Sequence, residues 1–215
     1  PQRFIKLGKY RIPLGKPEIK LLRKSKPFWT ILGEHGIFST IIRVPITFPP
    51  EKFKGLMLSA MCVPDLKGTQ GSFTHYTTRE RTERFTGGAE ITLERNGGAM
   101  RSYFSGPENT LLKKPEEMRI PFELVPLNGA DTAELRFDGQ KLNLKKGEYS
   151  DWIRLSFKAA PGIKVHGICR LLLKELQPQC ELYVTPINID PAKPALPISH
   201  PFIYAVYLAK LLGRF

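Results

Sequence analysis

The sequence has little cysteine, and none of it stands in a spacing that holds a metal ion. Cys62, Cys169 and Cys180 are the three cysteines among 215 residues, and no two of them form a CxxC motif. Three thiols cannot all pair with one another, so the sequence argues against both a disulfide scaffold and a structural zinc site. We expect buried free thiols in a reducing compartment, which favours the cytoplasm.

Histidine pairs and long apolar runs are also missing. No two histidines stand in an HxH, HxxxH or DxH spacing, because they are scattered at positions 35, 75, 166 and 200. The longest apolar stretch, residues 202–212, is too short to span a bilayer and contains Lys210. The sequence therefore predicts neither a local histidine site for a metal ion nor a transmembrane helix.

Acidic residues are scarce near the N-terminal end. Residues 1–26 carry nine Lys or Arg and one acid, Glu18, for a net charge of +8, whereas the other 189 residues contribute +5. Clustered cations gain affinity for polyanions by releasing counterions from phosphates. Two interpretations stay open: this basic arm binds nucleic acid or an anionic membrane, or it is a solvated flank. We favour the flank, because no recognised nucleic-acid-binding motif is present.

Two stretches have the pattern of an α/β domain. Ser25 and Pro27 precede a short helical pattern that ends at Gly36, and residues 38–44 form a β-branched run apolar enough to be buried on both faces. Residues 182–189 predict another strand, and the stretch from 202 has the apolar spacing of an amphipathic helix. Such a helix needs a partner surface, so we expect the rest of a domain or another subunit to cover it.

The middle of the chain has a different pattern. Apolar and polar residues alternate in several short runs between residues 89 and 175, and Asn96-Gly97-Gly98 and Asp138-Gly139 are strong hairpin turns. Six or more short strands at this spacing predict an antiparallel sandwich or a barrel-like module.

The best marker of function is the loop-rich stretch 43–78. Its GTQGS segment, residues 68–72, resembles a phosphate-cradling loop but lacks the lysine and the spacing of a P-loop, and a tight turn is an equal alternative. An aspartate in this stretch could bind a metal or cap a helix, and capping is favoured. Threonine hydroxyls here could donate hydrogen bonds to a phosphate. The candidate substrate-binding residues are Thr47, Asp65, Thr69, Gln70 and Ser72.

Five segments follow one another along the chain: KPFWTILGEHGIFSTIIRVPITFPP, GLMLSAMCVPDLKGTQGSFTHYTT, GEYSDWIRLSF, LYVTPINIDP and PISHPFIYAVYLAKLLGRF. Together they resemble phosphohydrolases of the alkaline-phosphatase superfamily, in the branch of type I phosphodiesterases and nucleotide pyrophosphatases. The resemblance implies hydrolysis of phosphate esters with two divalent metal ions, usually zinc, that hold a Thr or Ser nucleophile. This chain contains no DxxxH or DHG motif, so no catalytic or metal-binding residue is carried over.

The resemblance also implies an architecture, an α/β alkaline-phosphatase-like core segment that carries an inserted antiparallel β-rich, sandwich-like subdomain. We expect residues 1–84 to belong to the core with its basic arm and loops, 85–178 to form the insertion as a cap, and 179–215 to return to the core. In this architecture the chain supplies loops on the substrate side of the active site, and it is inactive alone. Its partners are a small phosphate ester and the missing core segments or another subunit, rather than nucleic acid or a membrane surface.

The alternative is a non-catalytic, β-rich binding module whose basic arm recruits anionic partners. The apolar faces of the two flanking helices distinguish the alternatives. A self-contained module should cover these faces, whereas a portion of a larger enzyme should leave them open.

Overall fold

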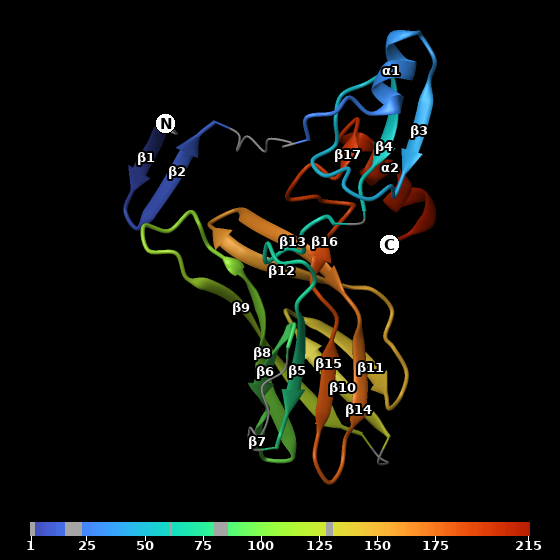
Figure 1. Ribbon diagram of the computed structural model, residues 1–215. Coiled ribbons are helices and arrows are strands. Elements are labelled where there is room, and N and C mark those ends of the chain that lie inside the picture. Colours follow the sequence, from blue (N-terminus) through green and yellow to red (C-terminus); the bar gives the residue numbers. More distant parts are fainter. Residues whose placement is uncertain (1–2, 16–22, 61, 80–85, 128–130) are drawn as a thin grey trace.

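The computed structural model describes residues 3–15, 23–60, 62–79, 86–127 and 131–215 (Figure 1). Within these ranges the protein is mostly β, with 48% of residues in strands, 9% in helix and two helices. The predicted α/β alkaline-phosphatase-like core was therefore wrong. The alternation of apolar and polar residues that is typical of strands dominates the chain. The apolar runs that were expected to build an α/β core form only a small three-stranded layer.

The largest sheet has five strands in the order β11-β10-β9-β8-β7. Their bounds are β7 Glu94–Asn96, β8 Ala99–Glu108, β9 Glu117–Pro126, β10 Thr132–Phe137 and β11 Gln140–Lys145. Gly97 and Gly98 turn β7 into β8, while Asp138 and Gly139 turn β10 into β11, and all four have positive φ angles between 44° and 84°. Two consecutive positive φ angles are typical of type I′ turns, so both predicted hairpins are confirmed.

Two smaller sheets pack against the large one. One has the order β14-β15-β5-β6 and the other β12-β13-β16. Their bounds are β5 Phe73–Thr77, β6 Gly88–Thr92, β12 Ile153–Ala160, β13 Ile163–Cys169, β14 Leu171–Glu175, β15 Glu181–Val184 and β16 Asn188–Ile189. A single buried cluster, with Phe104, Leu135, Leu155 and Leu182 fully inside it, joins all three sheets. We call this part the strand body.

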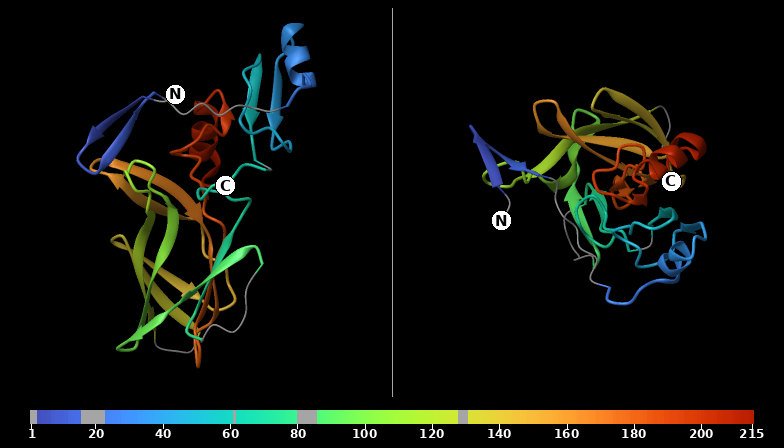
Figure 2. Two further views of the ribbon diagram at one scale, coloured as in Figure 1. Left: turned by 60° about the vertical axis from the view of Figure 1, so that its left-hand side comes forward. Right: turned by 90° about the horizontal axis from the view of Figure 1, so that it is seen from above.

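A small α/β layer projects from the strand body (Figures 1 and 2). It contains the helices α1 Phe28–Glu34 and α2 Ile203–Leu212 and the strands β3 Ser39–Ile42, β4 Gly55–Leu58 and β17 Ser199–His200. The strands have the order β17-β4-β3, with β3 and β4 parallel and β17 antiparallel to β4. Segments from both ends of the described chain therefore build one layer.

Burial in this layer is less complete than the sequence predicts. Residues 38–44 were expected to be covered on both faces, yet Phe38 and Ile42 are 60% and 52% exposed and only Ile41 of the run is buried. Trp29 of α1 packs with Ile41 on one face of β3, whereas Phe38 and Ile42 leave the other face open. Neither described helix has the length and apolar content needed to cross a membrane.

The basic arm is more ordered than a solvated flank. Strands β1 Arg3–Leu7 and β2 Tyr10–Leu14 form a hairpin, and residues 16–22 lie outside the described part of the chain. The amide of Arg11 donates to the Leu111 carbonyl at 2.6 Å, and the amide of Lys113 donates to the Lys9 carbonyl at 3.1 Å. These bonds attach the hairpin to the turn between β8 and β9, while most of its described side chains stay exposed to solvent, so the flank is folded as well as solvated.

The three cysteines are free thiols, but they are not all buried. Cys62 is exposed, whereas Cys169 and Cys180 are buried in the strand body. Burial raises the pKa of the Cys180 thiol to about 12 and also raises the pKa of Cys169. Both buried thiols are therefore protonated and unreactive at neutral pH.

Candidate functional site

A pocket of about 210 Å³ lies where the carboxyl ends of β3 and β4 meet. Arg43 follows β3, and Ser59 and Ala60 follow β4, and all three residues line the pocket. Trp152 and Asn188 line it from the strand body. In α/β sheets, ligands bind in the crevice outside the carboxyl ends of the strands. We call this hollow the Arg43 pocket and take it as the candidate functional site.

Arg43 is the positive charge of this pocket. None of the ion pairs among the described residues includes its guanidinium, and its side chain is exposed. Its backbone has a φ of 56°, in the left-handed region, and its amide donates to the Leu58 carbonyl at 2.8 Å. A left-handed conformation at a residue other than glycine costs on the order of 1 kcal/mol and is concentrated at ligand sites. The fold therefore holds an uncompensated cation at the mouth of the pocket.

Thr47 supports the loop beside the pocket rather than lining it. Its hydroxyl donates to the Val44 carbonyl at 2.7 Å, and its own carbonyl accepts from the Ser59 hydroxyl at 2.6 Å. Both side chains are buried, with 2% and 3% of their surface exposed. Thr47 thus ties the loop that follows Arg43 to Ser59, which lines the pocket.

The structure brings Asp65, Thr69 and Ser72 together, but around one another. The Asp65 carboxylate is buried and accepts hydrogen bonds from the Thr69 amide at 2.8 Å, the Ser72 amide at 3.2 Å and the Thr69 hydroxyl. Asp65 therefore caps its own loop, not a helix, and occupies the place that a bound anion would take. Gln70 is exposed at the tip of this loop. None of these four residues lines the Arg43 pocket.

Replacing Asp65 with alanine is expected to lower the free energy of unfolding by roughly 1–3 kcal/mol, because two partly buried amides and the Thr69 hydroxyl lose their acceptor. Urea denaturation measures this difference. The matched control is Gln70→Ala, two residues from Ser72 in the same loop, which should change stability by less than about 0.5 kcal/mol. Equal effects of the two substitutions would contradict the structural role of Asp65.

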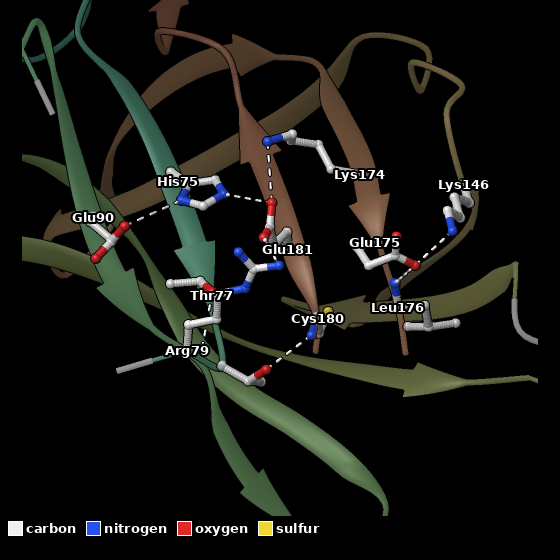
Figure 3. A network of polar contacts seen from close by, with 11 residues as sticks. His75, Thr77, Arg79, Glu90, Lys146, Lys174, Glu175, Leu176, Cys180 and Glu181 are labelled. Atoms are coloured by element: carbon white, nitrogen blue, oxygen red, sulfur yellow. Dashed lines mark hydrogen bonds and ion pairs between the residues drawn. The ribbon is translucent and has the colours of Figure 1, made fainter. Parts of the chain in front are cut away.

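A network of charged residues crosses β6, β5 and β15 (Figure 3). The ring of His75 lies between two carboxylates, with Nδ1 3.5 Å from Glu90 Oε2 and Nε2 3.5 Å from Glu181 Oε2. Glu181 also pairs with Lys174 at 3.1 Å and with Arg79 at 3.2 Å. No local spacing in the sequence indicates this network, because only the strand register brings residues so far apart in the chain together.

Burial alone would raise the pKa of Glu181, but the hydrogen bond from Lys174 and the charges of Lys174, Arg79 and His75 lower it. A carboxyl group whose pKa falls on folding stabilises the protein above its unfolded pKa, near 4.3, and loses this contribution as the pH falls through the folded pKa. The network therefore strengthens the four-stranded sheet at neutral pH and weakens in acid.

The substitution Glu181→Gln is expected to cost about 1–3 kcal/mol of unfolding free energy at pH 7, because it removes an ionised acceptor from Lys174 and Arg79. The difference from wild type should shrink as the pH is lowered from 6 to 3, in a series of urea denaturations. Glu148→Gln, which alters an exposed pair with Lys145, is the control and should show little change at any pH. A pH-independent effect of Glu181→Gln would argue for packing instead of charge.

Within the described ranges, no group of three or more His, Cys, Asp or Glu side chains is placed to hold a metal ion. The described residues therefore do not fit the two-metal site that the resemblance implies. No family model matches the chain, and no curated protein or solved structure matches it either. The Arg43 pocket and the surfaces around it are therefore the structural basis for a candidate function.

Proposed function

We propose that this chain is the substrate-side and cap portion of a metal-dependent phosphohydrolase that cleaves phosphate esters. The nucleophile and the metal ligands of that enzyme would come from protein outside the described residues, so the chain is inactive alone. The observation that carries the proposal is the Arg43 pocket, with its unpaired guanidinium at the carboxyl ends of two parallel strands. The metal-dependent chemistry in this proposal comes from the resemblance of five segments to type I phosphodiesterases, whose α/β core this chain does not have.

The chemistry of the pocket lining suits a phosphate ester. A guanidinium presents a planar fork of donors that matches two phosphate oxygens, and it keeps its charge at every physiological pH. Asn188 adds an amide donor, while the Ser59 hydroxyl is already donated to Thr47 and can only accept. The flat, half-buried ring of Trp152 supplies an apolar wall for the organic part of the ester. The pocket therefore combines one anion site with one apolar surface.

The open apolar faces of the small layer support a portion of a larger enzyme. Five large apolar side chains on its two helices are each more than half exposed: Phe28, Ile203, Tyr207, Leu211 and Leu212. Burying such a side chain fully is worth about 1.5–3 kcal/mol, so a layer built to work alone would cover them. A self-contained module should cover the apolar faces of its flanking helices, so these open faces favour the enzyme portion.

Isothermal titration with phenyl phosphate tests the anion site. Arg43→Ala is expected to weaken binding at least tenfold, since a hydrogen-bonded charge contributes roughly 1.5–3 kcal/mol. Lys52→Ala, which removes an exposed cation from the loop before β4, should leave the affinity within about twofold. Equal binding by wild type and Arg43→Ala would overturn the site.

Hydrolysis of bis-p-nitrophenyl phosphate tests the second half of the proposal. With added Zn²⁺ or Mn²⁺, the 215-residue chain is expected to release p-nitrophenol no faster than a metal-only blank. Robust turnover would overturn the claim that the nucleophile and the metal ligands lie elsewhere.

A further inference from the structure

A second charged surface runs from the hairpin β1–β2 along β13 to α2, and it shares no lining residue with the Arg43 pocket. The hairpin β1–β2 stands beside the turn between β12 and β13 in two views of the molecule (Figures 1 and 2). A hollow of about 480 Å³ separates them and is lined by Lys9, Lys158 and Lys164. A second hollow of about 460 Å³ lies on the other side of Lys164 and is lined by His166 and Lys193. Lys164 is thus the shared wall of two adjoining grooves.

The cations of these grooves differ from those on the large sheet. Arg101, Arg119 and Arg136 each have a glutamate partner within 4.0 Å. Lys9, Lys158, Lys164 and Lys193 take part in none of the ion pairs among the described residues, and neither groove is lined by an Asp or Glu. All four lysines are exposed. Their positive charge is therefore available to an external anion.

Each groove also offers an aromatic ring. Tyr10 lines the groove beside the hairpin, and Phe202, 52% exposed, lines the groove beside α2. Grooves that combine unpaired cations with accessible aromatic rings are typical of proteins that bind single-stranded nucleic acid, because the cations follow the phosphates while bases stack on the rings. Two adjoining grooves suit an extended phosphodiester chain better than one phosphate group.

We propose that the two grooves on either side of Lys164 bind single-stranded nucleic acid through its phosphodiester backbone, with Tyr10 and Phe202 as stacking surfaces. The basic hairpin contributes one side of this surface, because its bonds to residues 111 and 113 place Lys9 opposite Lys158. This binding is separate from phosphate-ester recognition in the Arg43 pocket, and it departs from the expectation that nucleic acid is not a partner.

Fluorescence anisotropy with a labelled oligothymidylate of about twelve nucleotides, which is long enough for an aromatic-lined groove, tests the proposal. The full chain should bind with an affinity that falls steeply between about 50 mM and about 200 mM salt. The double substitution K158E/K164E is expected to weaken binding at least tenfold and to make the slope of log K against log salt shallower by about 1.4 units, since two phosphate contacts of about 0.7 each are lost. Phe202→Ala should weaken binding roughly fivefold or more without changing the slope.

The matched control is K52E/K210E, which makes the same change in net charge at two exposed lysines outside the grooves. It should reduce affinity by less than about threefold, because screened charges at a distance contribute little. If K158E/K164E does not fold, K9E/K193E replaces it, since these lysines line the same two grooves. Equal losses of affinity in the groove variants and in K52E/K210E would show that binding depends on net charge alone, and would overturn the proposal.

Two further outcomes would overturn the assignment to nucleic acid. One is competition by inorganic phosphate at concentrations equal to the total phosphate of the oligonucleotide. The other is stronger, Lys158-dependent binding to phosphatidylserine vesicles than to the oligonucleotide. Arg43→Ala should retain oligonucleotide binding and K158E/K164E should retain phenyl phosphate binding, so the two proposed sites can fail independently.

Discussion

Replacing Asp190 with alanine is expected to lower the free energy of unfolding by about 3–5 kcal/mol, because it breaks a buried ion pair. Asp190 is fully buried, and its carboxylate accepts hydrogen bonds from the Arg154 side chain and, at 2.9 Å, from the Ala192 amide. Removing it leaves the guanidinium of Arg154, on β12, partly buried and without its carboxylate. Urea or thermal unfolding measures the loss.

The same substitution should also disturb the candidate site. Ile189 and Pro191, the two neighbours of Asp190, both line the Arg43 pocket. The double variant D190L/R154L is the matched control, because replacing both partners of a buried pair by apolar groups is far less costly than removing one. If D190A unfolds within about 0.5 kcal/mol of wild type, the pair does not hold this segment in place.

The second large effect is expected for Phe104→Ala, which should cost about 3–5 kcal/mol. Phe104 is completely buried at the centre of the strand body, where its ring centroid lies 4.7 Å from that of Phe122 and 5.4 Å from that of Phe137. Its removal loses the free energy of transferring the ring from water into the core, and it loses the aromatic contacts as well. It also leaves a cavity that the surrounding strands cannot close.

Phe38→Ala is the matched control for Phe104→Ala, since Phe38 is 60% exposed on the small layer. We expect it to change stability by less than about 1 kcal/mol. A similar loss for both variants would mean that the open face of β3 is covered in solution, for example by a second copy of the chain. A measurement of the oligomeric state would then decide whether a second copy, and not a missing part of an enzyme, covers the exposed faces.

The sequence predicts the hairpins well because their signals are local. The turns at Gly97 and Asp138 specify the φ angles of two neighbouring residues, and α1 ends, as predicted, just before Gly36, whose φ is 78°. The strand β5 was hidden in the loop-rich stretch 43–78, because its partner β15 lies more than one hundred residues away. The α/β core was predicted from a helix–glycine–strand pattern, from apolar runs and from the resemblance to a phosphohydrolase family, none of which shows how many strands pair or what covers them.

The candidate site shows the same division between local and long-range signals. Asp65, Thr69 and Ser72 were identified from a glycine-rich loop and do come together, but their contacts are with one another. The residues that complete the Arg43 pocket, Trp152 and Asn188, come from distant segments of the strand body. No local spacing links them to Arg43, so only the fold could identify the pocket.

The most direct test of the central claim uses the tryptophan in the pocket wall. Titration with phenyl phosphate should change the intrinsic fluorescence in a saturable way, because Trp152 lines the Arg43 pocket whereas Trp29 is buried in the small layer. The account predicts that W152F abolishes the change and that Arg43→Ala shifts the midpoint to at least tenfold higher concentration. A saturable change that persists in W152F, or a midpoint unaffected by Arg43→Ala, would contradict a phosphate-ester site in this pocket.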